Sequence, residues 1–163
     1  MDDREKLYEG RQILNDICAA LDQQERKYTR NDEKLQVTFT AYGEDMPIDF
    51  KFIVHYKNQA VRLLGYLPFH AKENVRYDMA VAVAAANYGL ILGQFDFDLS
   101  DGELRYRMSE RYADSRIGYT VYQRMISTSV GVIEDYADKL MHLNKGMIDL
   151  ERCLKLIKEA DDA

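Results

Sequence analysis

Three aspartates, Asp96, Asp98 and Asp101, stand close together and are the first candidates for metal ligands in this sequence. Hard cations such as calcium favour clustered carboxylate oxygens. An EF-hand calcium loop that began at Asp96 would need a glycine where Asp101 stands and a glutamate where Arg107 stands. The spacing therefore argues against a calcium site, and we expect no metal ion and no cofactor.

The same stretch has the pattern of a β-hairpin. Asp101-Gly102 is a dipeptide preferred in two-residue hairpin turns, and apolar residues alternate on both sides of it. With that turn, Asp98 lies opposite Arg105 and Asp96 lies opposite Arg107. We therefore interpret the aspartates as partners of the arginines across two paired strands.

The histidines and cysteines do not form a recognisable catalytic or zinc-binding arrangement. His55, His70 and His142 are expected on a strand, a loop and a helix, without the paired spacing of zinc sites on helices. Neither Cys18 nor Cys153 has an adjacent histidine, and the chain contains no Gly-x-Ser-x-Gly turn and no glycine-rich phosphate loop. We therefore expect a protein that is not an enzyme.

The two cysteines are expected on helices near opposite ends of the chain. Buried, reduced thiols are the simplest interpretation of Cys18 and Cys153. A redox-responsive pair is the alternative, if the two terminal helices are neighbours. Both interpretations fit a cytoplasmic protein.

The composition is that of one folded, acidic domain. The 163 residues suit a single core, which we expect to span 1–163, and the shares of hydrophobic (47%) and charged (31%) residues suit a buried interior under a solvated surface. A formal net charge of −6 argues against nucleic acid as the main partner. No apolar run has the roughly 20 residues of a bilayer span, and Met1–Lys6 does not resemble a secretory leader. We expect a cytoplasmic protein without a membrane partner.

The first half of the chain predicts one helix followed by three strands. Apolar residues recur at helical spacing over 3–21, the polar stretch 22–31 breaks this pattern, and 31–33 is expected to be a loop. Period-two alternation then predicts strands over 35–41, 46–56 and 60–69. The third of these strands carries apolar residues on both faces.

The apolar residues on the second face of these strands are Ile53, Leu64 and Tyr66. Either another part of the monomer covers them, or they form an exposed patch that awaits a partner. Tyr119 and Tyr122 are further candidates because tyrosine is favoured at protein interfaces, although packing in the core is the simpler interpretation. These five residues are the candidate partner or dimer surface.

The second half of the chain predicts a helix, the hairpin and two further helices. Asn74 can cap an alanine-rich helix over 75–88, and Gly89 suits its end. Small side chains on this helix allow it to approach a sheet closely. Amphipathic spacing predicts a long helix over 122–141, and an additional C-terminal helix is expected over about 147–160.

The order of helix, three strands, helix, hairpin and long helix resembles the type III secretion chaperone-like fold, to which YbjN-family proteins belong. The local pattern is more specific. The alanine-rich stretch MAVAVAAANYG (79–89) leads into the hairpin GQFDFDLSDGELRYRMS (93–109) and then into a long helix. This is similar to the YbjN pattern over residues 74–144, whereas the helix over 147–160 departs from it.

The resemblance implies an α+β fold of order α-β-β-β-α-β-β-α, with helices packed on an antiparallel sheet. It also implies a homodimer and a binding role, since the family has no signature catalytic residues and its members are described as sensory transduction regulators or chaperone-like proteins. The expected function is a non-catalytic protein-binding or chaperone-like module, with regulation in bacterial signalling as one form of it. The alternative is a small-molecule or ion sensor with a ligand pocket between sheet and helix.

Overall fold

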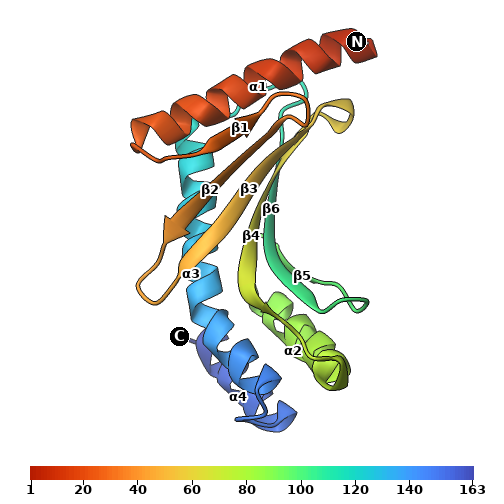
Figure 1. The fold of residues 1–163 in the computed structure, drawn as a ribbon, viewed down its shortest axis with the longest axis vertical. Helices are drawn as coiled ribbons and strands as arrows, with labels where there is room; N and C mark the ends of the chain where they lie inside the picture. The colour runs from red at the N-terminus through yellow and green to blue at the C-terminus, as the bar shows by residue number, and fades with distance from the viewer.

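The computed structural model describes residues 1–163 as a six-stranded antiparallel sheet with four α-helices. Helix α3 runs behind the sheet, α1 crosses one end of it, and α2 and α4 lie together at the other end (Figure 1). None of these helices is both long and apolar enough to cross a membrane. The elements in chain order are α1 (Asp3–Gln23), β1 (Thr29–Asn31), β2 (Gln36–Tyr42), β3 (Pro47–His55), the 3-10 turn η1 (Tyr56–Asn58), β4 (Ala60–His70), the 3-10 turn η2 (Glu73–Val75), α2 (Arg76–Gly89), β5 (Gln94–Phe97), β6 (Glu103–Arg111), α3 (Tyr119–Asn144) and α4 (Leu150–Asp161).

The strands follow one another across the sheet in the order β1-β2-β3-β4-β6-β5. Every neighbouring pair is antiparallel. The chain builds β1 to β4 as a meander, leaves the sheet as α2, and returns to pair β6 with β4 and β5 with β6. The predicted fold class, an α+β fold in which helices pack on an antiparallel sheet, is confirmed.

Helices cover one face of the sheet, and the strands alternate accordingly. On β3, Ile48, Phe50, Phe52 and Val54 are buried, whereas the residues between them are exposed or half-buried. Side chains that point alternately to the two faces give this pattern when one face carries the core. The buried residues of the strands and helices join in one apolar cluster of 38 residues.

A glycine in β4 marks the contact between the sheet and α3. A Cβ atom on Gly65 would lie 2.6 Å from the ring of Phe50 and 2.7 Å from Cδ1 of Ile133 on α3. Side-chain carbons do not approach one another so closely, and therefore only glycine fits without a shift of its neighbours. Helix α3 can consequently lie directly against the middle of the sheet.

Helix α4 holds α2 and α3 together at one end of the sheet. Helix α2 buries Met79, Ala82 and Ala86 on one face, and it contacts both α4 and β5. The hydroxyl of Tyr136 on α3 donates a hydrogen bond to the carboxylate of Asp161 at the end of α4. The additional C-terminal helix predicted from the sequence is therefore present and packs into the core.

The structure contains a strand that the sequence does not predict. Thr29–Asn31 lies at the end of the polar stretch 22–31, for which no strand is predicted, and pairs with the start of β2 at the edge of the sheet. All three of its residues are exposed, so they lack the apolar alternation by which a strand is recognised. The predicted cap of α2 is also wrong, because Asn74 lies in η2 and the helix begins after Val75 without a side-chain cap.

The predicted hairpin is present, but its turn is longer and its register is shifted. Asp96 lies opposite Arg105 rather than Arg107. The carboxylate of Asp98 accepts hydrogen bonds from the N–H and the hydroxyl of Ser100, at 2.8 Å and 2.6 Å, and this stabilises the longer turn. Since the shift along β5 is by an even number of residues, each strand residue keeps the face that was predicted for it.

Both cysteines are buried and free. Burial raises the pKa of the Cys18 thiol, and it raises the pKa of Cys153 to about 11. Cys18 is on α1 and Cys153 is on α4, and these helices lie at opposite ends of the molecule (Figure 1). The two thiols therefore cannot pair within one chain.

We predict that Gly65→Ala lowers the free energy of unfolding by about 1–3 kcal/mol, because its methyl group would clash with both Phe50 and Ile133. Urea denaturation followed by circular dichroism measures the change. Gly131→Ala is the matched control, since Gly131 is exposed on α3 and nothing lies within 4 Å of its Cβ position. Alanine there should stabilise the protein by about 0.5–1 kcal/mol. Equal effects of the two changes would contradict the proposed contact.

Candidate protein-binding surfaces

Three of the five residues predicted to form a partner surface lie together. Ile53 is on β3, Leu64 and Tyr66 are on β4, and all three point to the face of the sheet that the helices leave uncovered. Tyr119 and Tyr122 are instead at the start of α3. The structure therefore brings the strand residues together and places the two tyrosines of α3 elsewhere.

Leu64 lies on the uncovered face but is only 1% exposed. Lys51 on β3 and Arg107 on β6 stand directly opposite it in the register. Long charged side chains cover apolar neighbours with their aliphatic stems while their charged ends stay in water. Ile53 and Tyr66 are half-buried, and Nζ of Lys51 lies 5.9 Å from the centre of the Tyr66 ring. The uncovered face therefore presents charged groups above an apolar strand.

Tyr122 has a fully buried side chain. Its ring meets Phe52 edge-on, with 6.0 Å between ring centroids, and its hydroxyl has no hydrogen-bond partner. Burial raises the pKa of this hydroxyl. Tyr119 is half-buried against the core. Tyr122 is therefore packed in the core.

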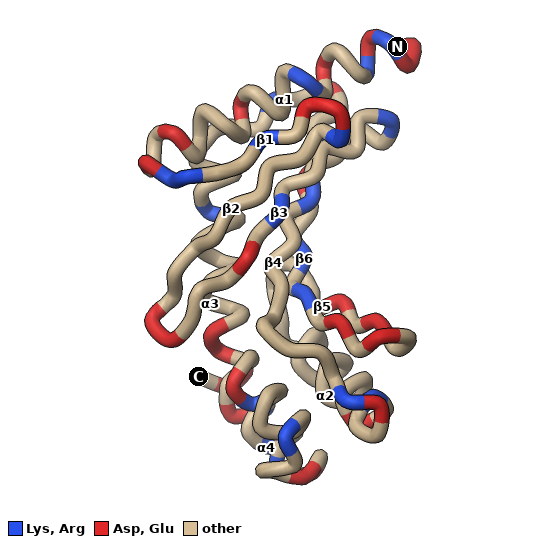
Figure 2. Tube along the Cα trace, in the orientation of Figure 1, with Lys and Arg blue, Asp and Glu red and all other residues tan.

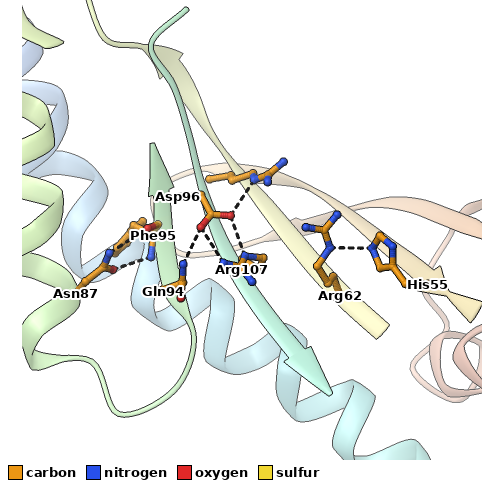
Figure 3. A network of polar contacts seen from close by, with 8 residues as sticks. His55, Arg62, Asn87, Gln94, Phe95, Asp96 and Arg107 are labelled. Atoms are coloured by element: carbon orange, nitrogen blue, oxygen red, sulfur yellow. Dashed lines mark hydrogen bonds and ion pairs between the residues drawn. The ribbon is translucent and has the colours of Figure 1, made fainter. Parts of the chain in front are cut away.

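A network of ion pairs lies on the uncovered face around Asp96 of β5. Its carboxylate accepts hydrogen bonds from Nε of Arg107 at 2.9 Å, Nε of Arg105 at 3.1 Å and Nε2 of Gln94 at 2.9 Å (Figure 3). Burial alone would raise the pKa of Asp96, but the hydrogen bonds from Arg107, Gln94 and Arg105 outweigh it and hold the pKa below its usual range. The ionised carboxylate therefore neutralises part of the charge of two arginines.

Arg62 on β4 extends this network without a carboxylate of its own. Its Nε donates to Nε2 of His55 at 2.8 Å (Figure 3), and it forms no ion pair. An imidazole that accepts this bond is neutral, and burial and the neighbouring Arg62 lower the pKa of His55 accordingly. Burial and the charges of Arg105 and Arg107 lower the pKa of Arg62 itself.

We call Arg62, Arg105 and Arg107 the arginine cluster. Together with Asp96 it places three guanidinium groups and one carboxylate on one side of the sheet. Figure 2 shows basic segments of β6 beside the acidic segments of the β5–β6 hairpin. Because the whole chain carries a net charge of −6, this local excess of positive charge runs against the average of the molecule.

A hollow of about 940 Å³ adjoins the arginine cluster on the uncovered face. Residues 24–29, which are the α1–β1 loop and the first residue of β1, form one wall, and β2, β3 and β4 form the floor. Tyr66 borders the hollow and stands opposite Arg105 of the cluster in the register. The sensor alternative expects a pocket between sheet and helix, whereas this hollow lies on the face of the sheet that has no helix.

The outer edge of β2 is only partly occupied. Strand β1 pairs with the first half of β2 and leaves 39–42 without a neighbouring strand on the side away from β3. In antiparallel strands, every second residue directs its backbone N–H and C=O to the same neighbouring strand. The hydrogen bond from Val54 N–H to Leu35 C=O shows that Leu35 and every second residue after it direct these groups to β3. Thr40 and Tyr42 therefore direct their N–H and C=O groups outward, where they have no backbone partner.

The largest group of strongly exposed apolar residues lies on α2, which the sequence analysis did not select. Tyr77 is 84% exposed, Val81 is 48% exposed and Tyr88 is 94% exposed. With Ala84 they occupy one helix face, because they are spaced by three or four residues. Ile91 in the following loop is 96% exposed. We call Tyr77, Val81, Ala84, Tyr88 and Ile91 the α2 surface.

The sequence does carry a signal for this surface. No residue from Met79 to Phe95 is charged, and Figure 2 shows an uncharged trace through most of α2 and the loop after it. A helix that is apolar on all sides needs cover on all sides. The small alanine side chains predict close contact with one neighbour, which accounts for the buried face of α2 and leaves the opposite face unexplained.

The loop after α2 is fixed by hydrogen bonds. The side chain of Asn87 donates to the carbonyl of Phe95 at 3.0 Å and accepts from its N–H at 2.7 Å (Figure 3). The hydroxyl of Tyr106 donates to the carbonyl of Leu92. Ile91 is therefore held at the surface by an anchored backbone.

Comparison with known proteins places the fold. No protein-family model matches the sequence, and no curated protein matches it. Among solved structures, YbjN from E. coli, a proposed transcription regulator, superimposes with a TM-score of 0.57 at 12% identity over 74% of this chain and 84% of that one. The HopA1-SchA chaperone-effector complex gives a TM-score of 0.52 at 14% identity over 82% of this chain and 94% of that one. The chain has the type III secretion chaperone-like fold.

We predict that Asp96→Asn lowers the free energy of unfolding by about 1–2 kcal/mol near neutral pH, because two half-buried guanidinium groups lose their carboxylate. The folded-state pKa of Asp96 is below its unfolded value, so this stabilisation is present above about pH 4 and is lost as the pH falls through the folded value. Urea unfolding at several pH values should show the difference from the wild type shrink on acidification.

Asp138→Asn is the control for that measurement. Asp138 has a side chain that is 62% exposed and forms an ion pair with Lys139 alone. Its removal should change stability by less than about 0.5 kcal/mol. A cost of Asp96→Asn that is the same at all pH values would contradict the ion-pair account.

Proposed function

We propose that this chain is a non-catalytic, chaperone-like protein-binding module that self-associates through the α2 surface. The observation that carries the proposal is the exposure of Tyr77, Tyr88 and Ile91, the last two within the uncharged stretch 79–95. The proposal takes residues 1–163 as one domain that acts in the cytoplasm, a compartment in which free thiols such as those of the two buried cysteines persist.

Exposed apolar side chains grouped on one helix face favour association. Burying a large apolar side chain contributes about 1.5–3 kcal/mol. Scattered apolar residues need no explanation, whereas a contiguous group marks an interaction site. Tyrosine is also favoured at interfaces because its ring can be buried while its hydroxyl stays solvated. The α2 surface meets these conditions.

A second copy of the chain is the partner that suits the α2 surface best. A twofold contact brings a surface against itself, which an uncharged surface tolerates and a charged one does not. Tyr77 and Tyr88 lie about 16 Å apart along the helix, with Val81 and Ala84 between them. A twofold axis near Val81 and Ala84 would place Tyr77 of each copy beside Tyr88 of the other.

The solved structures with this fold support a protein-binding role. One is a chaperone in complex with an effector protein, and another is a proposed transcription regulator. We infer that this chain likewise binds a protein partner. If that partner is a regulator, the role of the chain is regulation in bacterial signalling. On the uncovered face Asp96 pairs with Arg105 and Arg107, and His55 accepts a hydrogen bond from Arg62. The engagement of Asp96 and His55 within the chain supports a non-catalytic role.

We predict that Val81→Lys converts a dimer into a monomer, because it places two like charges close to the twofold axis. Light scattering after size exclusion, over a wide range of concentrations, should give about twice the chain mass of 19.0 kDa for the wild type and one chain mass for the variant. Val121→Lys is the matched control, since Val121 is 38% exposed on α3, away from the α2 surface.

A wild-type protein that stays monomeric at high concentration would contradict the proposed self-association. So would a dimer that survives Val81→Lys and is lost in Val121→Lys, because the interface would then lie on α3. Thermal unfolding of both variants shows whether each is folded before its mass is interpreted.

A further inference from the structure

The arginine cluster holds more positive charge than the chain neutralises. Arg105 and Arg107 share the carboxylate of Asp96, whereas Arg62 donates to neutral His55. The side chains of Arg105 and Arg107 are 28% and 29% exposed, so each keeps one side open to solvent. An external anion that reached the cluster would gain charge-assisted hydrogen bonds in a partly desolvated setting.

Two rows of side chains connect the hollow with the cluster across the sheet. The first row is Thr38, Lys51, Leu64 and Arg107, and the second is Thr40, Asp49, Tyr66 and Arg105. Three strand spacings separate β2 from β6, a span of about 14 Å. An extended peptide covers that distance in about four residues. A segment that lies in the hollow can therefore place a side chain on the arginines.

We propose that the hollow and the arginine cluster bind an acidic peptide segment of a partner protein, with a glutamate or aspartate carboxylate between Arg62 and Arg107. This deepens the protein-binding role and rests on it. The planar guanidinium fork matches a carboxylate in two parallel hydrogen bonds. Arg62 donates to His55 through Nε, and its two terminal nitrogens are free for the incoming carboxylate.

The surroundings of the cluster favour a peptide over a nucleic acid. The lining of the hollow carries both signs of charge: Asp49 and Glu25 are acidic, and Arg26, Lys27 and Lys51 are basic. A phosphate backbone, which carries a charge on every nucleotide, would meet the two carboxylates as well as the basic residues, whereas a peptide can place a neutral residue beside each carboxylate. The hydroxyls of Thr38 and Thr40 and the ring of Tyr66 suit the amides and side chains of an extended peptide.

Fluorescence anisotropy with two labelled peptides tests the proposal. Each has about ten residues, enough to cross the sheet; one alternates Thr and Glu, and the other alternates Thr and Gln. The chain's net charge of −6 repels acidic molecules overall, so tighter binding of the Glu peptide must come from a local site. We expect the Glu peptide to bind about tenfold more tightly than the Gln peptide, and to lose this advantage at high salt.

Three variants locate the site. Arg62→Gln should weaken the Glu peptide about tenfold and leave the Gln peptide unchanged. Arg124→Gln removes the same charge from an exposed position on α3 and should change either affinity less than about twofold. Asp96→Asn should strengthen binding of the Glu peptide, because it removes the competing carboxylate. A purely structural role of Asp96 would not make the variant bind the Glu peptide more tightly. If Asp96→Asn does not fold, the Arg62→Gln result alone decides the test.

Equal affinities for the two peptides, or equal losses in Arg62→Gln and Arg124→Gln, would overturn the proposal. A single-stranded oligothymidylate of the same charge as the Glu peptide is the further probe, and its tighter, Arg62-dependent binding would overturn the assignment to a peptide. Val81→Lys distinguishes this site from the α2 surface. A monomeric Val81→Lys protein should bind the Glu peptide as tightly as the wild type does. The peptide site and the self-association are therefore tested independently.

Discussion

The contact between α3 and the inner face of the sheet decides which surfaces this molecule can offer. Gly65 leaves room for Phe50 and Ile133 to pack closely against β4, and α1 packs beside α3. With both helices on one face, the other face has no helical cover and is stabilised by its own side chains. Ion pairs around Asp96 and the position of Leu64 between Lys51 and Arg107 fulfil that requirement. The result is a face that is charged at the surface and apolar beneath.

The two candidate surfaces differ in the kind of recognition that they allow. The α2 surface offers apolar area, whose contribution is non-directional and grows with the area buried. The arginine cluster offers oriented donors, which contribute specificity and association rate more than raw affinity. The hollow beside the cluster and the α2 surface lie at different edges of the sheet, since the α1–β1 loop lines the hollow and α2 lies beside β5 (Figure 1). A dimer formed through α2 would thus present two separate hollows, and a partner with two acidic segments would gain avidity.

The spacing of apolar residues along the chain predicts the helices and strands, but not the features that depend on contacts between elements. The faces of the strands, the long helix α3 and the final helix follow from spacing alone. Strand β1 does not, because three exposed residues at an edge have no apolar alternation. The register of the hairpin is also not predicted by spacing, because the hydrogen bonds from Ser100 to Asp98 favour a longer turn over the two-residue turn. Leu64 was ambiguous for a related reason: whether an apolar residue on a second face is exposed depends on the neighbours across the strands, which only the register supplies.

His55 has a specific effect on the charge of the uncovered face. The chain has 28 acidic and 22 basic residues, so a carboxylate partner for Arg62 would be easy to supply. The structure instead provides a neutral imidazole, which orients the guanidinium through Nε and leaves its charge uncompensated. Burial and the charge of Arg62 both lower the pKa of His55, so the imidazole stays neutral where an ordinary histidine would begin to protonate. Two of the three guanidinium groups thus share one carboxylate within the chain, and the third is oriented but unpaired, the condition under which an external carboxylate gains most from binding.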